Sequence, residues 1–279
     1  RREKVSWRAL ERAVGRLFVH QGWSHVAVAG GPGDRGADVI ASSDKRDIVA
    51  QVKYRKQTEY TAGKQIVRDV KRAMEFYDVT EGLCITNTRL SESAENYRQT
   101  LANEGYNISV QEGADLLSVY EGLPRWPQTN YSPREYQRGP IETLLQLYQD
   151  GEDRALLSLA TGLGKTFVAG RVLARILDSN PELRILILAD QRPLLKQFEK
   201  SLWNHLPKEV STHLWYGPES PTYNSGIDIG TFQSLKNPDR LSTAKAKEYD
   251  IVVVDEAHHA PADSYKRVLD RTDPRFLLG

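Results

Sequence analysis

Residues 160–166, which read Ala-Thr-Gly-Leu-Gly-Lys-Thr, decide the fold of the second half of the chain. They follow an apolar segment at 155–159 that we expect to be a strand, and they precede a segment at 167–177 with helical periodicity. The N–H groups at the start of a helix bind anions, and glycines let the backbone wrap around a phosphate. The spacing therefore predicts a nucleotide-binding loop.

Individual residues of this loop have distinct expected roles. Lys165 would reach the β- and γ-phosphates of ATP, and the hydroxyl of Thr166 would hold Mg²⁺. The general phosphate-loop pattern has glycine at the position of Leu159, so this chain departs from it there. The remaining contacts to ATP are expected from Thr161, Gly162 and Gly164.

Apolar segments and segments of helical periodicity alternate along the second half of the chain. The apolar segments are 155–159, 184–189, 227–231 and 251–254. Such alternation predicts a parallel sheet wrapped by helices, an α/β fold. Ligands of such sheets bind at the carboxyl ends of the strands, and Asp255 and Glu256 follow the last segment. We expect Asp255 to hold Mg²⁺ and Glu256 to orient or deprotonate an attacking water.

Length and composition predict about two domains. The chain has 279 residues, 38 Lys and Arg against 37 Asp and Glu, and one cysteine, Cys84. This balance does not by itself indicate nucleic acid, and one cysteine excludes an intrachain disulfide or a Cys-rich zinc site. No apolar run approaches a membrane span and the first residues lack a signal peptide, so we expect a cytoplasmic protein with no membrane partner. A proline-rich stretch at 122–132 predicts a linker between domains 1–121 and 133–279.

The first half of the chain predicts a mixed sheet flanked by helices. We expect helices at 7–20, 63–77 and 91–104 and strands at 26–29, 37–41, 48–54, 83–86 and 107–110. The turn at 43–46 makes the second and third of these strands a hairpin. This order places helices and strands in one compact α/β domain.

Asp38, Gln51 and Lys53 are predicted to meet in this hairpin. Gln51 and Lys53 are two residues apart, so they share one face of their strand, and antiparallel pairing brings Asp38 beside them. Carboxylate and amide oxygens suit Mg²⁺, and an ammonium can orient water or stabilise a phosphate. Glu11, on the first helix, could reach the same metal. From spacing alone, a solvated strand face is the more frequent reading of such a pattern.

Several segments of the second half resemble the first RecA-like motor domain of superfamily-two helicases of the restriction type. Residues 160–166 resemble their motif I, which often lacks the first glycine, and residues 255–258 resemble motif II. The resemblance implies that Gln137 reads adenine and that Arg192, Thr231 and Gln233 contact the DNA backbone; ordinary loop residues remain the alternative for these last three. It also implies that the chain ends before motif III and a second motor domain.

Residues 3–121 resemble the Mrr-type branch of the PD-(D/E)xK nucleases. The resemblance rests on residues 36–40, 49–54, 82–87 and 91–94. It implies that Gln51 replaces the usual second acid without loss of activity and that Glu11 is the acid of the first helix. Asp38, Gln51, Lys53 and Glu11 would then be catalytic, with Asp38 and Gln51 as the metal ligands.

Together these features predict a restriction-type nuclease-translocase that uses ATP and Mg²⁺ and acts on double-stranded DNA. Modification-dependent restriction enzymes and type I restriction subunits both fit. We expect a homodimer on DNA or partner subunits of a restriction system. A DNA-anchoring module with an inactive nuclease fold and an RNA helicase with an accessory domain remain alternatives.

Overall fold

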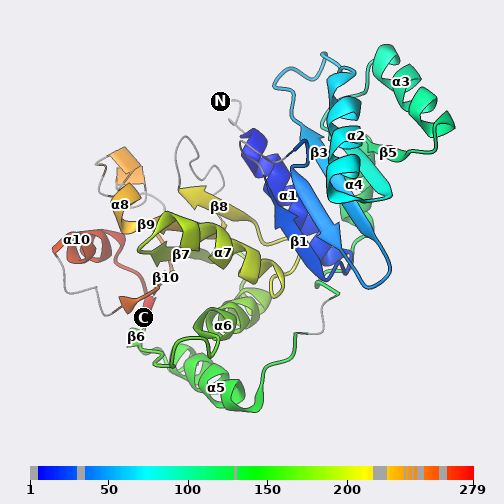
Figure 1. The fold of residues 1–279 in the computed structure, drawn as a ribbon. Coiled ribbons are helices and arrows are strands. Elements are labelled where there is room, and N and C mark those ends of the chain that lie inside the picture. The colour runs from blue at the N-terminus through cyan, green and yellow to red at the C-terminus, as the bar shows by residue number, and fades with distance from the viewer. Residues whose placement is uncertain are drawn as a thin grey trace. The chain divides into compact units, whose positions relative to one another are not determined.

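The protein is described here by a computed structural model. It covers residues 6–29, 35–128, 131–215, 225–235, 237, 239–240, 242–243, 248–257 and 263–279, without the side chains of 192, 263–265 and 267. The chain forms two compact units, residues 2–129 and 130–279, and each unit has its own sheet (Figure 1). Within the described residues, no helix is long and apolar enough to cross a membrane.

The N-terminal unit is built on a five-stranded sheet in the order β1-β2-β3-β4-β5. The β1–β2 and β2–β3 pairs are antiparallel, and the β3–β4 and β4–β5 pairs are parallel, so the predicted mixed sheet is confirmed. The hairpin closes where Ser43 binds the backbone N–H groups of Lys45 and Arg46. The strands are β1 (His25–Val28), β2 (Val39–Ser42), β3 (Asp47–Lys53), β4 (Glu81–Thr86) and β5 (Asn107–Gln111).

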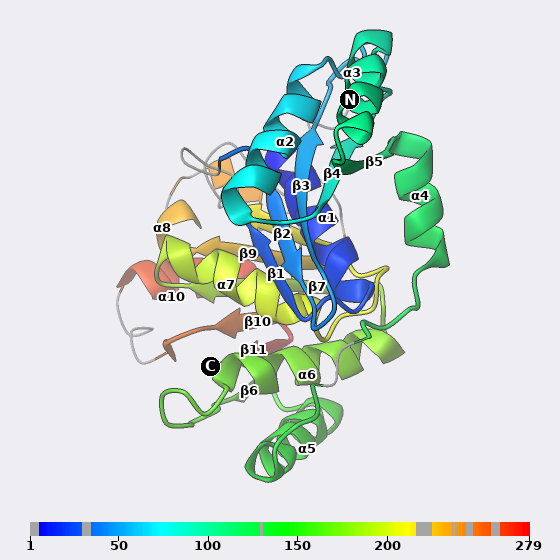
Figure 2. The ribbon, with the colours of Figure 1, turned by 45° about the vertical axis from the view of Figure 1, so that its right-hand side comes forward.

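Helices flank this sheet: α1 packs against β1 and β2, and α2 packs against β3 and β4 (Figure 2). Ser6 and Ser91 accept hydrogen bonds from the first turns of α1 and α3, which fixes where these helices begin. Buried residues of α2 and α3 form one core with Val49 and Cys84. The helices are α1 (Trp7–His20), α2 (Gln65–Tyr77), α3 (Glu92–Asn103) and α4 (Gly113–Gly122).

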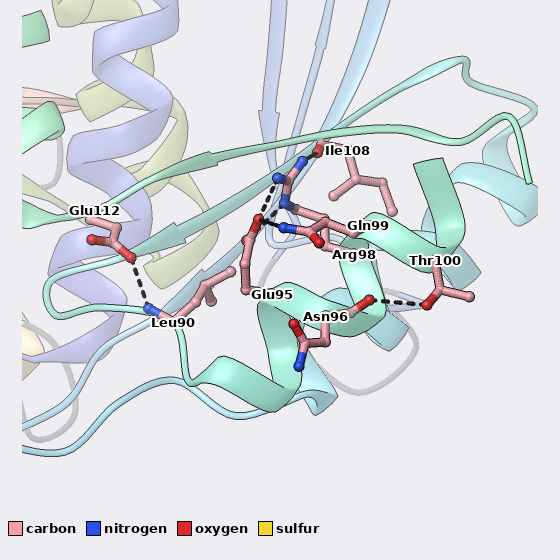
Figure 3. A network of polar contacts seen from close by, with 8 residues as sticks. All are labelled: Leu90, Glu95, Asn96, Arg98, Gln99, Thr100, Ile108 and Glu112. Carbon is pink, nitrogen blue, oxygen red and sulfur yellow. Dashed lines mark hydrogen bonds and ion pairs between the residues drawn. The ribbon is translucent and has the colours of Figure 1, made fainter. Parts of the chain in front are cut away.

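Polar contacts attach α3 to its neighbours (Figure 3). Arg98 binds Glu95 one turn earlier on the same helix and also donates to the carbonyl of Ile108 in β5 at 3.0 Å. Glu112 accepts from the backbone N–H of Leu90, just before α3, at 2.9 Å. Strand β5 is therefore bound to α3 through Ile108, and the residue that follows β5 is bound to the segment just before α3, which holds the last strand at its edge of the sheet.

The C-terminal unit is built on a six-stranded sheet in the order β6-β11-β10-β7-β9-β8. Every pairing in it is parallel, as predicted. Alternate residues of β7 enter two different cores, Ile185 and Ile187 on one face and Leu186 and Leu188 on the other. The strands are β6 (Arg154–Ala155), β7 (Arg184–Ala189), β8 (Thr212–Trp215), β9 (Gly226–Thr231), β10 (Ile251–Val254) and β11 (Phe276–Leu278).

The helices of this unit cover the two faces of its sheet. Buried residues of α5 and α6 join the core that holds Ile185, and Phe232 and Leu235 of α8 join the core that holds Leu186. A sheet buried on both faces needs apolar residues at successive positions, which explains the continuous apolar runs of β7 and β10. The helices are α5 (Glu135–Gln149), α6 (Lys165–Ser179), α7 (Arg192–Trp203), α8 (Phe232–Leu235) and α10 (Asp263–Thr272).

The structure corrects the predicted elements at three places. The strand expected at 155–159 is wrong for most of its length: β6 pairs with β11 and ends at Ala155, although the Leu157 N–H still donates to the Gly279 carbonyl at 2.8 Å. Helix α4 was missed because its apolar residues are not concentrated on one face, and none of its residues is buried. Strand β8 was missed because it is short and carries the polar His213, which hydrogen-bonds Asp228 of β9.

His205, just after α7, makes the stability of the C-terminal unit depend on pH. Its side chain is buried against the ring of Phe167, with ring centroids 4.8 Å apart. Burial, with a smaller contribution from Arg171, lowers the pKa of His205 from 6.5 to about 4. Between these values the unfolded chain binds more protons than the folded chain, so stability is lost as the pH falls from 6.5 toward 4.

Replacing His205 with glutamine removes this part of the pH dependence. We expect the wild-type chain to lose up to about 3 kcal/mol more than His205→Gln between pH 7 and pH 4. Urea unfolding at a series of pH values measures the difference, and His25→Gln, at an exposed position, is the control. Parallel curves for wild type and His205→Gln would contradict the assignment.

Candidate functional site

The predicted phosphate loop lies between the core and helix α6. Leu159 packs against the core of the unit, so the position that departs from the general pattern serves packing. Gly162 and Gly164 have φ values of 84° and 87°, which side-chain-bearing residues rarely adopt. Helix α6 begins at Lys165, two residues before the predicted start, so Lys165 and Thr166 form its first turn, and Thr161 is exposed in the loop.

Gln137 supports this loop from helix α5. Its side chain is buried, its Oε1 accepts from the backbone N–H of Arg134, and its Nε2 donates to the carbonyl of Leu163 at 2.9 Å. A Cβ at Gly164 would lie 2.6 Å from Nε2 of Gln137. The structure therefore brings Gln137 against the phosphate loop, and its expected contact with adenine stays a prediction.

Asp255 and Glu256 follow β10 directly, at the edge where the loop also lies. The Asp255 N–H donates to the carbonyl of Leu188 at 2.8 Å, so the β10–β7 pairing continues to the start of the acidic pair. Glu256 lies 3.4 Å from Nζ of Lys165, which joins the loop to the acidic pair. Glu256 also has a φ of 54°, a strained backbone conformation of the kind that clusters at functional sites.

The charges of this site fit a bound cation. Burial, and after it the charge of Glu256, raises the pKa of Asp255, while Lys165 opposes this shift. Two neighbouring carboxylates with one lysine leave negative charge that a divalent cation can neutralise, and their hard oxygen donors suit Mg²⁺. Asp255 and Thr166 as Mg²⁺ ligands stay predictions.

The residues expected to contact DNA have different environments. Thr231 is buried, and its hydroxyl accepts from the N–H of Ser234 at 3.0 Å, so it caps the short helix α8. Gln233 is exposed on α8. Arg192 is the first residue of α7, but its side chain lies outside the described residues. DNA contacts by these three residues stay predictions.

In the N-terminal unit, the structure brings Asp38 and Gln51 together. The register pairs Val39 with Ala50, so Asp38 and Gln51 occupy the next facing positions. The Asp38 side chain is 5% exposed, and its Oδ2 accepts hydrogen bonds from Nε2 of Gln51 and from the backbone N–H of Val52, the latter at 2.7 Å. The hydrogen-bonded pair confirms the hairpin geometry that the sequence predicted.

Lys53 and Glu11 have contrasting positions. Lys53 is exposed at the end of β3, two residues from Gln51 and therefore on the same face of the strand. Glu11 is 4% exposed on α1, which packs against β1 and β2. A contribution of Glu11 to the same metal stays a prediction.

The donors around Asp38 also fit Mg²⁺. This ion is commonly held by one or two carboxylates while it keeps several waters. Within the described residues there is no cluster of three or more His, Cys, Asp or Glu that could hold a metal, so a site with many carboxylates is absent there. Asp38 can supply one carboxylate and Gln51 an amide oxygen, and their role as ligands of Mg²⁺ stays a prediction.

Sequence reasoning missed one residue beside this cluster, Asn87. Its side chain binds both the backbone N–H and the carbonyl of Arg55, at 2.6 and 2.8 Å. Strands β3 and β4 are parallel, so their carboxyl ends meet, and that topology could have pointed to Asn87. The sequence itself shows an ordinary polar residue after a strand.

Comparison with known families assigns both units. A family model described as "Type III restriction enzyme, res subunit" matches residues 130–279, more than half of the chain. The chain belongs to this res-subunit family. A second model, described as "Restriction endonuclease", matches residues 2–120, so the N-terminal unit of this family member is a restriction endonuclease domain.

Curated relatives of this res-subunit family member include restriction subunits. The EcoAI endonuclease subunit of a type I restriction enzyme from Escherichia coli is 29% identical, over 53% of this chain and 19% of its own length. The EcoKI endonuclease subunit from E. coli K12 is 30% identical, over 60% of this chain and 17% of its own length. The chain thus spans about a fifth of the length of these relatives.

Two solved structures match this chain at low identity and with TM-scores below 0.5. One is a Sulfolobus solfataricus SWI2/SNF2 ATPase core with dsDNA, 19% identical, with a TM-score of 0.47 over 56% of this chain and 33% of that one. The other is the type ISP restriction-modification enzyme LlaGI, 20% identical, with a TM-score of 0.41 over 53% of this chain and 17% of that one. At these scores the assignment rests on the family models.

The contact between Gly164 and Gln137 predicts a coupled effect on the res-type unit. Gly164→Ala adds the strain of a left-handed side chain, about 1–2 kcal/mol, and displaces the Gln137 amide, which costs about 1 kcal/mol more. Gly151→Ala, at a φ of 80° with open space around it, is the matched control for strain alone. Urea unfolding without nucleotide measures both losses of stability.

The double variant Gln137→Ala/Gly164→Ala isolates the contact. In the Gln137→Ala background, the Gly164 substitution should cost only as much as Gly151→Ala. If its cost is the same with and without Gln137, the two residues are not coupled.

Proposed function

We propose that this chain is the nuclease and first motor portion of an ATP-dependent restriction enzyme. It hydrolyses phosphodiester bonds of double-stranded DNA in its N-terminal unit and hydrolyses ATP to move along DNA with its C-terminal unit. The observation that carries the proposal is the buried Asp38 carboxylate, which accepts a hydrogen bond from Gln51. Lys53 lies two residues after Gln51, on the same face of β3. Burial of a carboxylate is costly unless it is satisfied, which argues against a merely solvated face.

The residues around Asp38 have distinct roles in DNA cleavage. The Val52 N–H and the Gln51 amide hold the Asp38 carboxylate in one orientation. Asp38 and Gln51 would hold Mg²⁺, which would polarise the phosphodiester and activate a water for attack. Lys53, exposed at the strand end, stabilises the charge that develops on the phosphate. Glu11 supports the same metal region from α1.

The residues around the phosphate loop have distinct roles in ATP hydrolysis. The backbone of Thr161, Gly162 and Gly164 binds phosphate oxygens, and Lys165 neutralises the β- and γ-phosphates. Thr166 and Asp255 would hold Mg²⁺ with ATP. Glu256 accepts the proton of the attacking water. Without ATP, Lys165 pairs with Glu256 at 3.4 Å; when ATP binds, Lys165 leaves this ion pair and binds the phosphates instead.

The partners of this activity follow from the same proposal. The chain acts on duplex DNA in the cytoplasm, as a homodimer or with partner subunits of a restriction system. Arg192, Thr231 and Gln233 contact the DNA backbone, and the linker at 122–132 joins the nuclease to the motor. A preference for modified DNA would separate a modification-dependent enzyme from a type I-like subunit.

Lysine substitutions in the two sites test the proposal separately. We expect Lys53→Ala to reduce plasmid cleavage in Mg²⁺ by about 100-fold or more, because it removes a charge from the transition state. ATP hydrolysis in this variant should be unchanged. Lys165→Ala should abolish ATP hydrolysis while a duplex supplied in Mg²⁺ without ATP is cut as by wild type.

Lys45→Ala, at an exposed turn position, is the control for both measurements. Modified and unmodified plasmid, and an RNA duplex as competitor, complete the set. DNA binding without metal-dependent cleavage in wild type would favour the DNA-anchoring module. Preference for the RNA duplex would contradict DNA as the substrate.

A further inference from the structure

The backbone that follows the nuclease strand β3 is held by side chains from the end of β4. The Arg55 N–H donates to Oδ1 of Asn87, and Nδ2 of Asn87 donates to the Arg55 carbonyl. The hydroxyl of Thr86 donates to the Lys53 carbonyl at 2.9 Å. The Asn87 side chain thus makes the two hydrogen bonds that a neighbouring strand would make with Arg55. It fixes the backbone at Arg55, two residues beyond the end of β3.

These hydrogen bonds determine on which face the Arg55 side chain emerges. The Val52 N–H and the Ala50 carbonyl both bind Asp38, on the side of β2. Lys53 and Arg55 instead bind Thr86 and Asn87, on the side of β4. Along an extended chain, residues whose backbone groups bond toward the same neighbouring strand also have their side chains on the same face of the sheet. Arg55 therefore shares a face with Lys53 and Gln51.

The guanidinium of Arg55 has unused binding capacity. Its Nε is buried, and no hydrogen bond or ion pair joins the guanidinium to any residue in the described part of the chain. Arg98 and Arg72 of the same unit, by contrast, are paired with Glu95 and Asp69. A buried donor without a partner costs about 1–3 kcal/mol, which an anion bound beside it would offset.

We propose that Arg55 binds a phosphate of the DNA strand at the nuclease site and that Asn87 is the residue that positions it. The proposal rests on the proposed nuclease function. Arg55 lies about 7 Å along the extended backbone from Lys53, close enough to bind the phosphate next to the reacting phosphodiester. The guanidinium binds phosphate through two parallel hydrogen bonds, so its orientation matters, and Asn87 sets that orientation through the backbone.

Cleavage kinetics of the full chain at several salt concentrations test this role. Each protein–phosphate contact contributes about one unit to the slope of log affinity against log salt. Arg55→Ala should lower kcat/KM for a short duplex by about 10- to 100-fold, mainly through KM, and should flatten the slope by about one. Arg55→Lys keeps the charge and should restore the slope but not the full rate.

Two further variants separate positioning from general disruption. Asn87→Ala should raise KM by about tenfold with Arg55 present and should add little in the Arg55→Ala background, because both act through one contact. Arg46→Ala is the matched control, since Arg46 is an exposed arginine at the opposite end of β3. It should leave both KM and the salt slope unchanged.

If Arg55→Ala has the same salt slope as wild type, the proposal is overturned, even if the cleavage rate falls. A lower rate alone can come from partial unfolding, which reduces the active fraction but leaves the salt slope unchanged. If the wild-type chain cuts no DNA, the nuclease function fails, and equilibrium binding of a fluorescent duplex then decides the role of Arg55. A slope lower by about one in Arg55→Ala supports the phosphate contact, and equal slopes refute it.

Discussion

Strand pairing is the constraint on which both candidate sites depend. In the N-terminal unit, the β2–β3 register places Asp38 opposite Gln51, and the β3–β4 pairing brings Asn87 to Arg55. In the C-terminal unit, a hydrogen bond from Asp255 to Leu188 continues the β10–β7 pairing into the acidic pair. A slip of one residue would turn each of these side chains to the other face of its sheet. Register therefore determines the chemistry of both sites.

Charge is distributed differently at the sites and elsewhere on the surface. Exposed pairs such as Arg175 with Glu142 join opposite charges and contribute at most about 1 kcal/mol each. At the phosphate loop, two adjacent carboxylates share Lys165, and burial with mutual repulsion raises the pKa of Asp255. Such an arrangement is unfavourable without a ligand. It suits a site whose cation and phosphates arrive together with ATP.

The sequence predicted those parts of the fold that a strong local pattern encodes. Strand β7 and the mixed order of the first sheet were predicted because continuous apolar runs and a polar turn mark them. Helix α4 and strand β8 carry no such pattern, and β6 is shorter than its apolar run because its length depends on pairing with β11. Elements defined by their neighbours cannot be read from local periodicity.

The sequence by itself determined which chemical groups form the two candidate sites and in what order they occur along the chain. The phosphate loop, the acidic pair and the pattern of Asp38, Gln51 and Lys53 are all recognisable from residue spacing. Only the tertiary structure decided how they are supported: by the contact of Gln137 with Gly164, the hydrogen bond from Gln51 to Asp38, and the hydrogen bonds of Asn87 with the Arg55 backbone. These contacts join residues from different elements. Their geometry follows from strand register and helix packing, which depend on the whole of each unit.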